Sequence, residues 1–391
     1  MRLFGSSQRA ALAAGVAVCF VSGVITAPAH AATVGTMISV LPQPEGWRGV
    51  SNGSVVEYWM TGSDGTPKPA SGAVLIPPGP APRGGWPILA FDHGSFGLGP
   101  GCGAQSDPAR GPWPELRVAE DKFVASFLSK GFAVVAPDYL GLGRFDTGPH
   151  PYLELKTEAT ATIDLVRAAR SHFAELSRTW VVLGGSQGGH AALGTAHLQR
   201  TYAPELDFRG AIAIDPASDA ENLLPMAGPW GPDLPSEVGQ ALTVFVSSVL
   251  AGLRAARPDA NMDSYLTPRG RDVLDTVGQL CQDRMIDHVG AVRLSQLLSK
   301  PLTNRHFHEV LAAYLGLPTS GYDAPILLLV NATDISVPSP LHAALAARFA
   351  ANRVDYKMIV GTGRHLQINR EMLAAIDTFL ARIEPATTGQ N

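Results

Sequence analysis

The sequence predicts an α/β fold, a mostly parallel sheet with helices on both faces and a helical cap inserted into it. Short, continuously apolar segments alternate with amphipathic segments of helical period, which is typical of strands that are covered on both faces. The interval 216–322 breaks this alternation, because it holds helical stretches separated by prolines and no strand pattern. An insertion of about 100 residues is too long for a simple connection. We therefore expect a cap at 216–322, between a first core segment at 33–215 and a second at 323–391.

The elements follow from apolar runs bounded by Gly, Pro and polar turn residues. The expected strands are 55–60, 72–76, 88–91, 132–136, 180–183, 210–214, 326–330 and 356–360. The expected helices of the core are 118–130, 159–173, 191–199, 340–351 and 370–383, and those of the cap are 237–254, 270–285 and 305–315.

Composition sets the class of protein. The chain has 391 residues, 46% of them hydrophobic and 16% charged, with a net charge of -4. These values are ordinary for a globular protein and not for a disordered one. Because there is no basic cluster, we expect neither nucleic acid nor a strongly anionic surface as a partner.

The N-terminus has the features of a secretory signal. Arg2 and Arg9 flank the start, 10–27 is uncharged and mostly apolar, and Ala29-His30-Ala31 fits the small-x-small cleavage rule. We expect a signal peptide at 1–32, cleaved after Ala31 or Ala32, and a secreted protein. An uncleaved anchor is the alternative, although Ala, Gly and Ser make this run weakly hydrophobic for a membrane span.

The chain has three cysteines. Cys19 could suggest a lipoprotein, but the residues before it make a poor acylation signal. Once the signal is removed, Cys102 and Cys281 remain. In an exported protein two such cysteines are expected to pair, and the alternative is two free buried thiols.

The motif that carries the chemistry lies between an apolar run and a helix-forming segment. Gly184-Gly185-Ser186-Gln187-Gly188 has the form G-x-S-x-G and follows the expected strand 180–183. In this context the motif predicts a nucleophile elbow, a strained turn that exposes the serine hydroxyl. The glycines leave room for the turn, and the N-H of Gln187 would face an oxyanion.

A serine nucleophile needs a base and a group that orients the base. Asp334 follows the strand 326–330 and His365 follows the strand 356–360. This is the chain order Ser, Asp, His that a nucleophile elbow requires, with each residue at the carboxyl end of a strand. The rival acids are Asp323, which precedes its strand, and Asp215, which belongs to the strand directly after the elbow.

The second oxyanion donor should come from the loop after an earlier strand. We expect it to be the N-H of Ser95, with the side chain of Asp92 or Ser95 as a further helper, and we expect His93 to be structural. The segments 138–143 and 150–152 are interpreted as loop scaffolding. His306-Phe307-His308 has no nearby carboxylate or cysteine cluster in the sequence, so no metal site is expected there.

Five blocks of the sequence follow one another in a specific order and spacing, at 90–97, 102–106, 131–143, 150–153 and 184–192. In these blocks the chain resembles the secretory lipase family. The resemblance implies an α/β-hydrolase fold with a cap after the strand that follows the elbow, a triad at Ser186, Asp334 and His365, and a disulfide from Cys102 to Cys281. The chain departs from the family pattern at Ser95, where threonine is more usual, and in a loop at 102–106 that is one residue longer.

We therefore predict a secreted serine carboxylester hydrolase, a lipase or esterase, that needs no metal or organic cofactor. The expected partners are a small-molecule or lipid ester and, for a lipase, a transient contact with a lipid interface. The rival interpretations are an exported acyltransferase or a serine peptidase on the same scaffold, or a catalytically silent binding protein.

Overall fold

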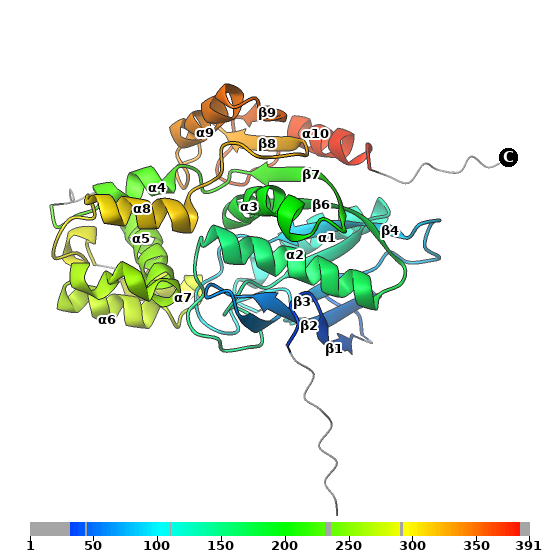
Figure 1. The fold of residues 1–391 in the computed structure, drawn as a ribbon, viewed down its shortest axis with the longest axis horizontal. Helices are drawn as coiled ribbons and strands as arrows, with labels where there is room; N and C mark the ends of the chain where they lie inside the picture. The colour runs from blue at the N-terminus through cyan, green and yellow to red at the C-terminus, as the bar shows by residue number, and fades with distance from the viewer. Residues whose placement is uncertain (1–31, 44, 110, 231–235, 290–291, 384–391) are drawn as a thin grey trace, which may run out of the picture. The chain divides into compact units, whose positions relative to one another are not determined.

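The computed structural model describes residues 32–383 except 44, 110, 231–235 and 290–291. The described residues from Thr33 onward form one compact unit, whose ribbon is shown in Figure 1. The expected signal peptide, 1–32, lies outside the described residues apart from Ala32.

A nine-stranded sheet organises this unit, with the strand order β1-β2-β3-β5-β4-β6-β7-β8-β9. Strands β1, β2, β3 and β5 pair antiparallel, and every pair from β5 through β4 to β9 is parallel. The strands are β1 Met37–Pro42, β2 Gly53–Thr61, β3 Pro67–Leu75, β4 Trp86–Asp92, β5 Ala133–Pro137, β6 Leu176–Gly185, β7 Asp207–Ile214, β8 Ile326–Asn331 and β9 Tyr356–Gly361. The prediction of a mostly parallel α/β sheet is confirmed.

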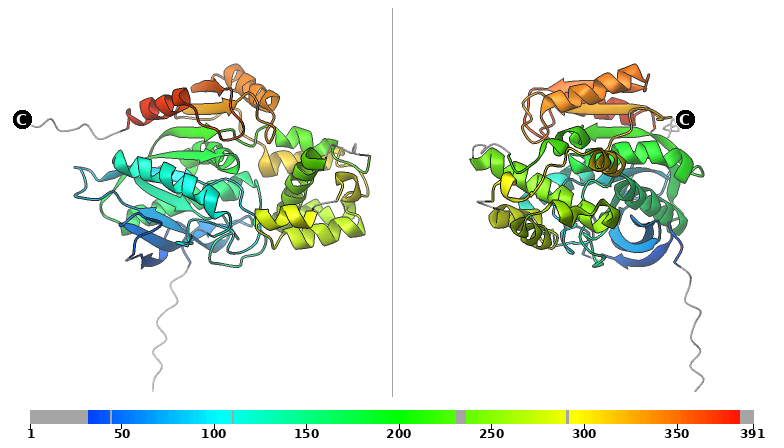
Figure 2. Two further views of the ribbon diagram at one scale, coloured as in Figure 1. Left: turned by 180° about the vertical axis from the view of Figure 1, so that it is seen from behind. Right: turned by 60° about the vertical axis from the view of Figure 1, so that its left-hand side comes forward.

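Helices cover both faces of the sheet (Figure 2). On one face α1 (Pro114–Ser129) and α10 (Arg370–Leu380) share a buried apolar cluster with sheet residues. On the other face lie α2 (Leu155–His172), α3 (Gln187–Tyr202) and α9 (Ser339–Ala351). The carboxyl ends of the parallel strands remain free for functional loops.

The chain between β7 and β8 is helical and has its own buried apolar cluster. It contains α4 Ala220–Leu223, α5 Ser236–Ala256, α6 Pro268–Val277, α7 Gln282–Val289 and α8 Arg305–Leu315, with short 3-10 turns between them. Within α5, Val238–Ala256 is long and apolar enough to cross a membrane, but more than half of this stretch is buried in the protein. We call residues 216–322 the cap below.

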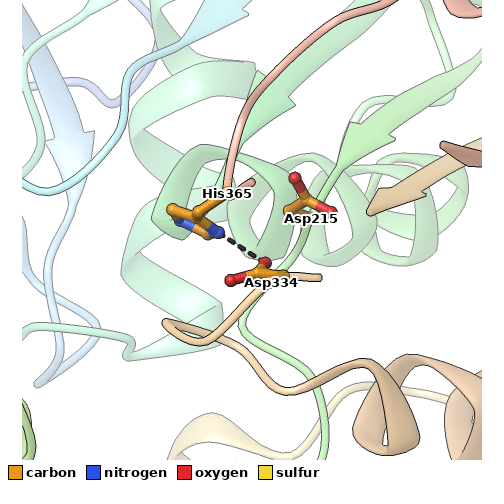
Figure 3. Close-up of side chains that lie close together, drawn as sticks. All are labelled: Asp215, Asp334 and His365. Carbon is orange, nitrogen blue, oxygen red and sulfur yellow. Dashed lines mark hydrogen bonds and ion pairs between the residues drawn. The ribbon is translucent and has the colours of Figure 1, made fainter. Parts of the chain in front are cut away.

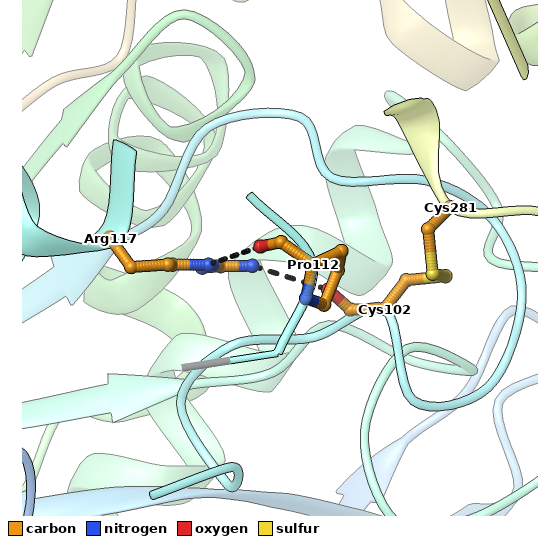
Figure 4. Close-up of a disulfide and its surroundings, with 4 residues drawn as sticks. All are labelled: Cys102, Pro112, Arg117 and Cys281. Carbon is orange, nitrogen blue, oxygen red and sulfur yellow. Dashed lines mark hydrogen bonds between the residues drawn. A yellow bond between two sulfur atoms is a disulfide. The ribbon is translucent and has the colours of Figure 1, made fainter. Parts of the chain in front are cut away.

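The prediction of a single cap helix at 270–285 is wrong, because this stretch belongs to two helices, α6 and α7. The break lies at Cys281, which forms a disulfide with Cys102 (Figure 4). Cys281 also forms an isolated β-bridge with Gly97. This backbone pairing requires an extended residue, so the helix cannot continue through it. The buried guanidinium of Arg117 fixes the partner loop by donating to the carbonyls of Pro112 and Cys102, each at 3.3 Å.

Candidate active site

Ser186 occupies a strained turn between β6 and α3. Its φ is 56° and its ψ is -119°, a backbone conformation that a non-glycine residue seldom adopts. A Cβ atom at Gly184 would collide with the Gly188 carbonyl, and one at Gly188 would collide with the Asp92 carbonyl. The two outer glycines of the motif are therefore required by close backbone approach, and the turn has the form of a nucleophile elbow.

The structure brings Ser186, His365 and Asp334 into one hydrogen-bonded chain. The Oγ of Ser186 lies 2.9 Å from Nε2 of His365, and Nδ1 of His365 lies 2.6 Å from Oδ2 of Asp334. The other oxygen of Asp334 accepts from the N-H groups of Ser336 at 2.8 Å and Val337 at 3.0 Å. Because the carboxylate can only accept, Nδ1 carries the proton and leaves Nε2 to accept from the serine.

Nearby imidazoles and a backbone N-H keep the Asp334 carboxyl ionised. Burial raises the pKa of the Asp334 carboxyl, but the imidazoles of His342 and His365 and the N-H of Val337 outweigh burial and hold the pKa well below its usual value. An ionised acid is what orients a histidine base and stabilises the imidazolium that forms when the base accepts a proton.

Asp215 lies beside this chain (Figure 3). Its carboxylate accepts from the backbone and side-chain amides of Asn331, at 2.7 and 2.8 Å, and from the N-H of Leu366 at 2.7 Å. Asp215 thus ties the end of β8 to the loop that carries His365. Asp323, the other rival acid, precedes β8 and accepts instead from Gln199.

Asp215, Asp334 and His365 each place a possible ligand atom within 4.8 Å of the others. Such a group could in principle hold a metal ion. Both oxygens of Asp215 already accept N-H bonds, however, and Nδ1 of His365 is committed to Asp334. The donor set is therefore suited to holding loops and a base in place.

Beneath the elbow lies a buried polar network that the sequence did not reveal. The side-chain amide of Gln187 donates to Glu158 at 2.8 Å and to Nε2 of His150 at 2.7 Å. Glu158 also accepts from Nδ1 of His190 at 2.7 Å, and Nε2 of His190 donates to the carbonyl of Leu315 in the cap at 2.8 Å. The network fixes Gln187, the residue that follows Ser186. Glu158, Gln187 and His190 are polar residues of α2 and α3, and nothing in the sequence indicates that they meet.

The loop after β4 carries the other expected oxyanion donor. The hydroxyl of Ser95 lies 2.8 Å from that of Tyr152, and Nδ1 of His93 lies 2.6 Å from the Gly94 carbonyl. Burial lowers the pKa of His93 to about 3, so its ring is neutral. Within the described part of the chain, the backbone N-H groups of Ser95 and Gln187 donate no hydrogen bond. The side chain of Asp92 is fully buried and accepts from Thr162.

A cavity of about 990 Å³ opens beside Ser186 and His365, a size at the upper end of small-molecule sites. Its lining is mostly apolar and comes from loops of the sheet, from α1 and from α5 in the cap. Glu120 is an acidic side chain in this lining, and burial raises its pKa to about 7. The hydrogen-bonded chain of Ser186, His365 and Asp334 therefore lies at a large, mostly apolar cavity.

Comparison with known proteins agrees with this architecture. Residues 116–296 match the secretory lipase family, as the sequence blocks predicted, and no curated protein matches the sequence. A lipase A from Candida antarctica has a TM-score of 0.71 at 18% identity, with 91% of this chain and 84% of that chain covered.

Two bacterial structures are similarly related. A mutant of the rice cell wall degrading esterase LipA from Xanthomonas oryzae has a TM-score of 0.73 at 21% identity, with 90% of this chain and 100% of that chain covered. A putative hydrolase from Legionella pneumophila has a TM-score of 0.64 at 18% identity, with 87% of this chain and 90% of that chain covered. At these identities the likeness shows the fold, which is the α/β-hydrolase fold.

Proposed function

Because the chain resembles the secretory lipase family over residues 116–296, we propose that it is an exported serine hydrolase of carboxylic esters. The observation that carries this proposal is the continuous hydrogen-bonded chain from Asp334 through His365 to Ser186, which ends at an apolar cavity. No metal or organic cofactor enters the proposed reaction.

In the proposed mechanism, the Oγ of Ser186 attacks the ester carbonyl carbon while Nε2 of His365 takes the hydroxyl proton. The tetrahedral intermediate collapses, the C-O bond to the alcohol breaks, and His365 gives its proton to the leaving alkoxide. A water molecule then attacks the acyl-enzyme by the same route, which releases the carboxylic acid and restores Ser186. Asp334 holds the imidazole in the required tautomer throughout.

The oxyanion of each intermediate would be held by the N-H groups of Ser95 and Gln187. Two observations support this role, the absence of another acceptor for either group among the described residues and the position of Gln187 directly after the nucleophile. One such donor is worth about 3 kcal/mol of transition-state stabilisation. The hydrogen bonds of the Gln187 side chain hold this residue, and with it the backbone N-H, in place.

The substrate class follows from the cavity. An apolar space of about 990 Å³ suits the acyl chain of a lipid ester such as an acylglycerol. We propose that the cap, 216–322, supplies one wall of the acyl site between core segments 33–215 and 323–391. The disulfide from Cys102 to Cys281 supports an exported protein with a cleaved 1–32 signal, because disulfides persist in oxidising compartments.

The test is hydrolysis of p-nitrophenyl esters from acetate to palmitate by the mature protein. We expect octanoate to be cleaved faster than acetate, and Ser186→Ala to abolish turnover. Ser171→Ala, at the C-terminal end of α2 and outside the cavity lining, is the matched control and should keep wild-type activity.

Labelling with an organophosphonate separates the remaining outcomes. A wild-type protein that neither turns over esters nor labels at Ser186 would refute the hydrolase proposal in favour of a binding protein. Labelling of Ser186 without ester turnover would instead favour an acyltransferase or a peptidase.

A further inference from the structure

His342 is a second buried histidine close to the acid of the proposed triad. It lies in the first turns of α9 and is 1% exposed. Its Nδ1 is 3.1 Å from the hydroxyl of Ser218, whose single hydrogen is within reach of this ring nitrogen and of the Pro216 carbonyl, also at 3.1 Å. One side of the ring is therefore anchored to the loop after β7.

The other side of the ring faces two carboxylates. Nε2 of His342 lies 3.8 Å from Oδ2 of Asp334 and 3.9 Å from Oδ1 of Asp215, and it has no hydrogen-bond partner among the described residues. These distances are longer than a hydrogen bond, so the contact is electrostatic. Oδ2 of Asp334 is also the atom that accepts from Nδ1 of His365.

This placement has a physical reason. Asp215 and Asp334 are both buried, and their nearest oxygens are within 4.8 Å of each other, so the two carboxylates repel each other. A ring nitrogen with an exposed lone pair would add to this repulsion, whereas an N-H directed between the carboxylates attracts both. Nε2 of His342 therefore carries a hydrogen and offsets the repulsion.

Resting on the hydrolase function proposed above, we propose that His342 is a positioning residue for the triad acid. Its Nε2-H holds the Asp334 and Asp215 carboxylates in their present arrangement, which keeps Oδ2 of Asp334 aligned on His365. This alignment matters most when His365 becomes an imidazolium, because the orientation of the ring then depends on Oδ2 of Asp334. Substrate binding does not involve His342, which is absent from the cavity lining.

The experiment compares two replacements of His342. His342→Phe keeps a ring but removes the N-H, and His342→Gln keeps an amide N-H that can reach the carboxylates. For p-nitrophenyl octanoate we expect His342→Phe to lower kcat about 10- to 100-fold, the range for a misaligned catalytic group, with KM unchanged. His342→Gln should recover most of the lost kcat. If the phenyl ring prevents folding, His342→Met takes its place with the same expectation, since methionine adapts to irregular space.

Phe349→Leu is the control for general loosening of α9. Phe349 is fully buried on the same helix and outside the cavity lining, so this change should lower Tm and leave kcat unchanged. A wild-type kcat in His342→Phe would overturn the inference. Equal losses in His342→Phe, His342→Gln and Phe349→Leu, in step with Tm, would also overturn it, because packing alone would explain them. An inactive wild-type protein with an unreactive Ser186 would refute the proposed function itself, and the inference with it.

Discussion

Replacing Glu158 tests the network beneath the elbow. Glu158 is fully buried and accepts from both Gln187 and His190. The second nitrogen of His190 faces the Leu315 carbonyl, so both ring nitrogens point at acceptors and both need a hydrogen. His190 is thus a buried imidazolium whose counter-charge is Glu158.

The cost of Glu158→Ala follows from this arrangement. Removing one partner of a buried ion pair leaves the other charge uncompensated, and we expect the free energy of unfolding to fall by about 3–5 kcal/mol. Glu158→Gln keeps the volume, and its amide can donate to Nδ1 of a His190 that has become neutral. That variant should lose only about 1–2 kcal/mol, the value of one buried hydrogen bond that is not remade.

The assay is urea denaturation followed by intrinsic fluorescence, with a double-mutant cycle that includes His190→Gln. We expect an unchanged m-value, a smaller free energy of unfolding for Glu158→Ala, and a coupling between positions 158 and 190 well outside additivity. If Glu158→Ala lies within about 1 kcal/mol of wild type, or if Glu158→Gln is as unstable as Glu158→Ala, the buried ion pair does not exist.

The pH dependence of the free energy of unfolding gives an independent check on the charge of His190. Burial lowers the pKa of His190, but the Glu158 carboxylate and the Leu315 carbonyl outweigh burial and raise the pKa above its usual value. The folded state therefore holds this proton more tightly than the unfolded chain does. The stabilisation is complete below the unfolded pKa of about 6.5 and is lost as the pH rises through the raised folded pKa. The difference between wild type and Glu158→Ala should shrink as the pH rises above the unfolded pKa of about 6.5.

Three further changes probe the cavity, the disulfide and the loop anchor. Glu120→Gln removes a carboxyl whose pKa burial raises to about 7. A charge in an apolar cavity is unfavourable, so KM for p-nitrophenyl octanoate should fall at pH 8, where Glu120 is ionised, and change little at pH 6. An equal change in KM at both pH values would contradict this expectation. Replacing Cys102 and Cys281 together by alanine should lower the free energy of unfolding by about 2–5 kcal/mol, measured by urea denaturation, and an unchanged midpoint would show that the bridge does not constrain the unfolded chain. Asp215→Asn keeps the size but cannot accept from all three N-H donors, so kcat should fall about 10-fold or more in steady-state assays; a kcat equal to wild type would mean that the loops hold without it.

Most of the sheet could be predicted because its strands are short apolar runs between Gly and Pro turns. The strand β1, Met37–Pro42, was missed because it is an edge strand whose side chains are partly exposed, so it lacks the apolar run that reveals a buried strand. The break between α6 and α7 was missed for another reason. Its cause is the pairing of Cys281 with Gly97, a contact between distant segments that leaves no local signal in the helical pattern.

The residues of the proposed triad could be located because each follows a strand at the same edge of the sheet. Topology then brings Ser186, Asp334 and His365 together even though 179 residues separate the serine from the histidine. Their catalytic roles stay a prediction until activity is measured. The sequence argument is strong here because, in this fold, a residue that follows a parallel strand lies at the carboxyl edge of the sheet.

The supporting residues could not be found in the same way, because a helix gives their side chains no position relative to the site until it is packed. His342 lies in α9 and Glu158 in α2, two helices that cover one face of the sheet, and the sequence of neither helix indicates that this side chain lies near the site. In the folded protein both side chains are buried, and a buried polar group needs a partner. Glu158 accepts from Gln187, which follows the proposed nucleophile, and His342 lies beside the proposed acid, Asp334. A polar residue on the buried face of a core helix in this fold is therefore a candidate positioning residue, and His342→Phe and Glu158→Ala test that rule at two independent places.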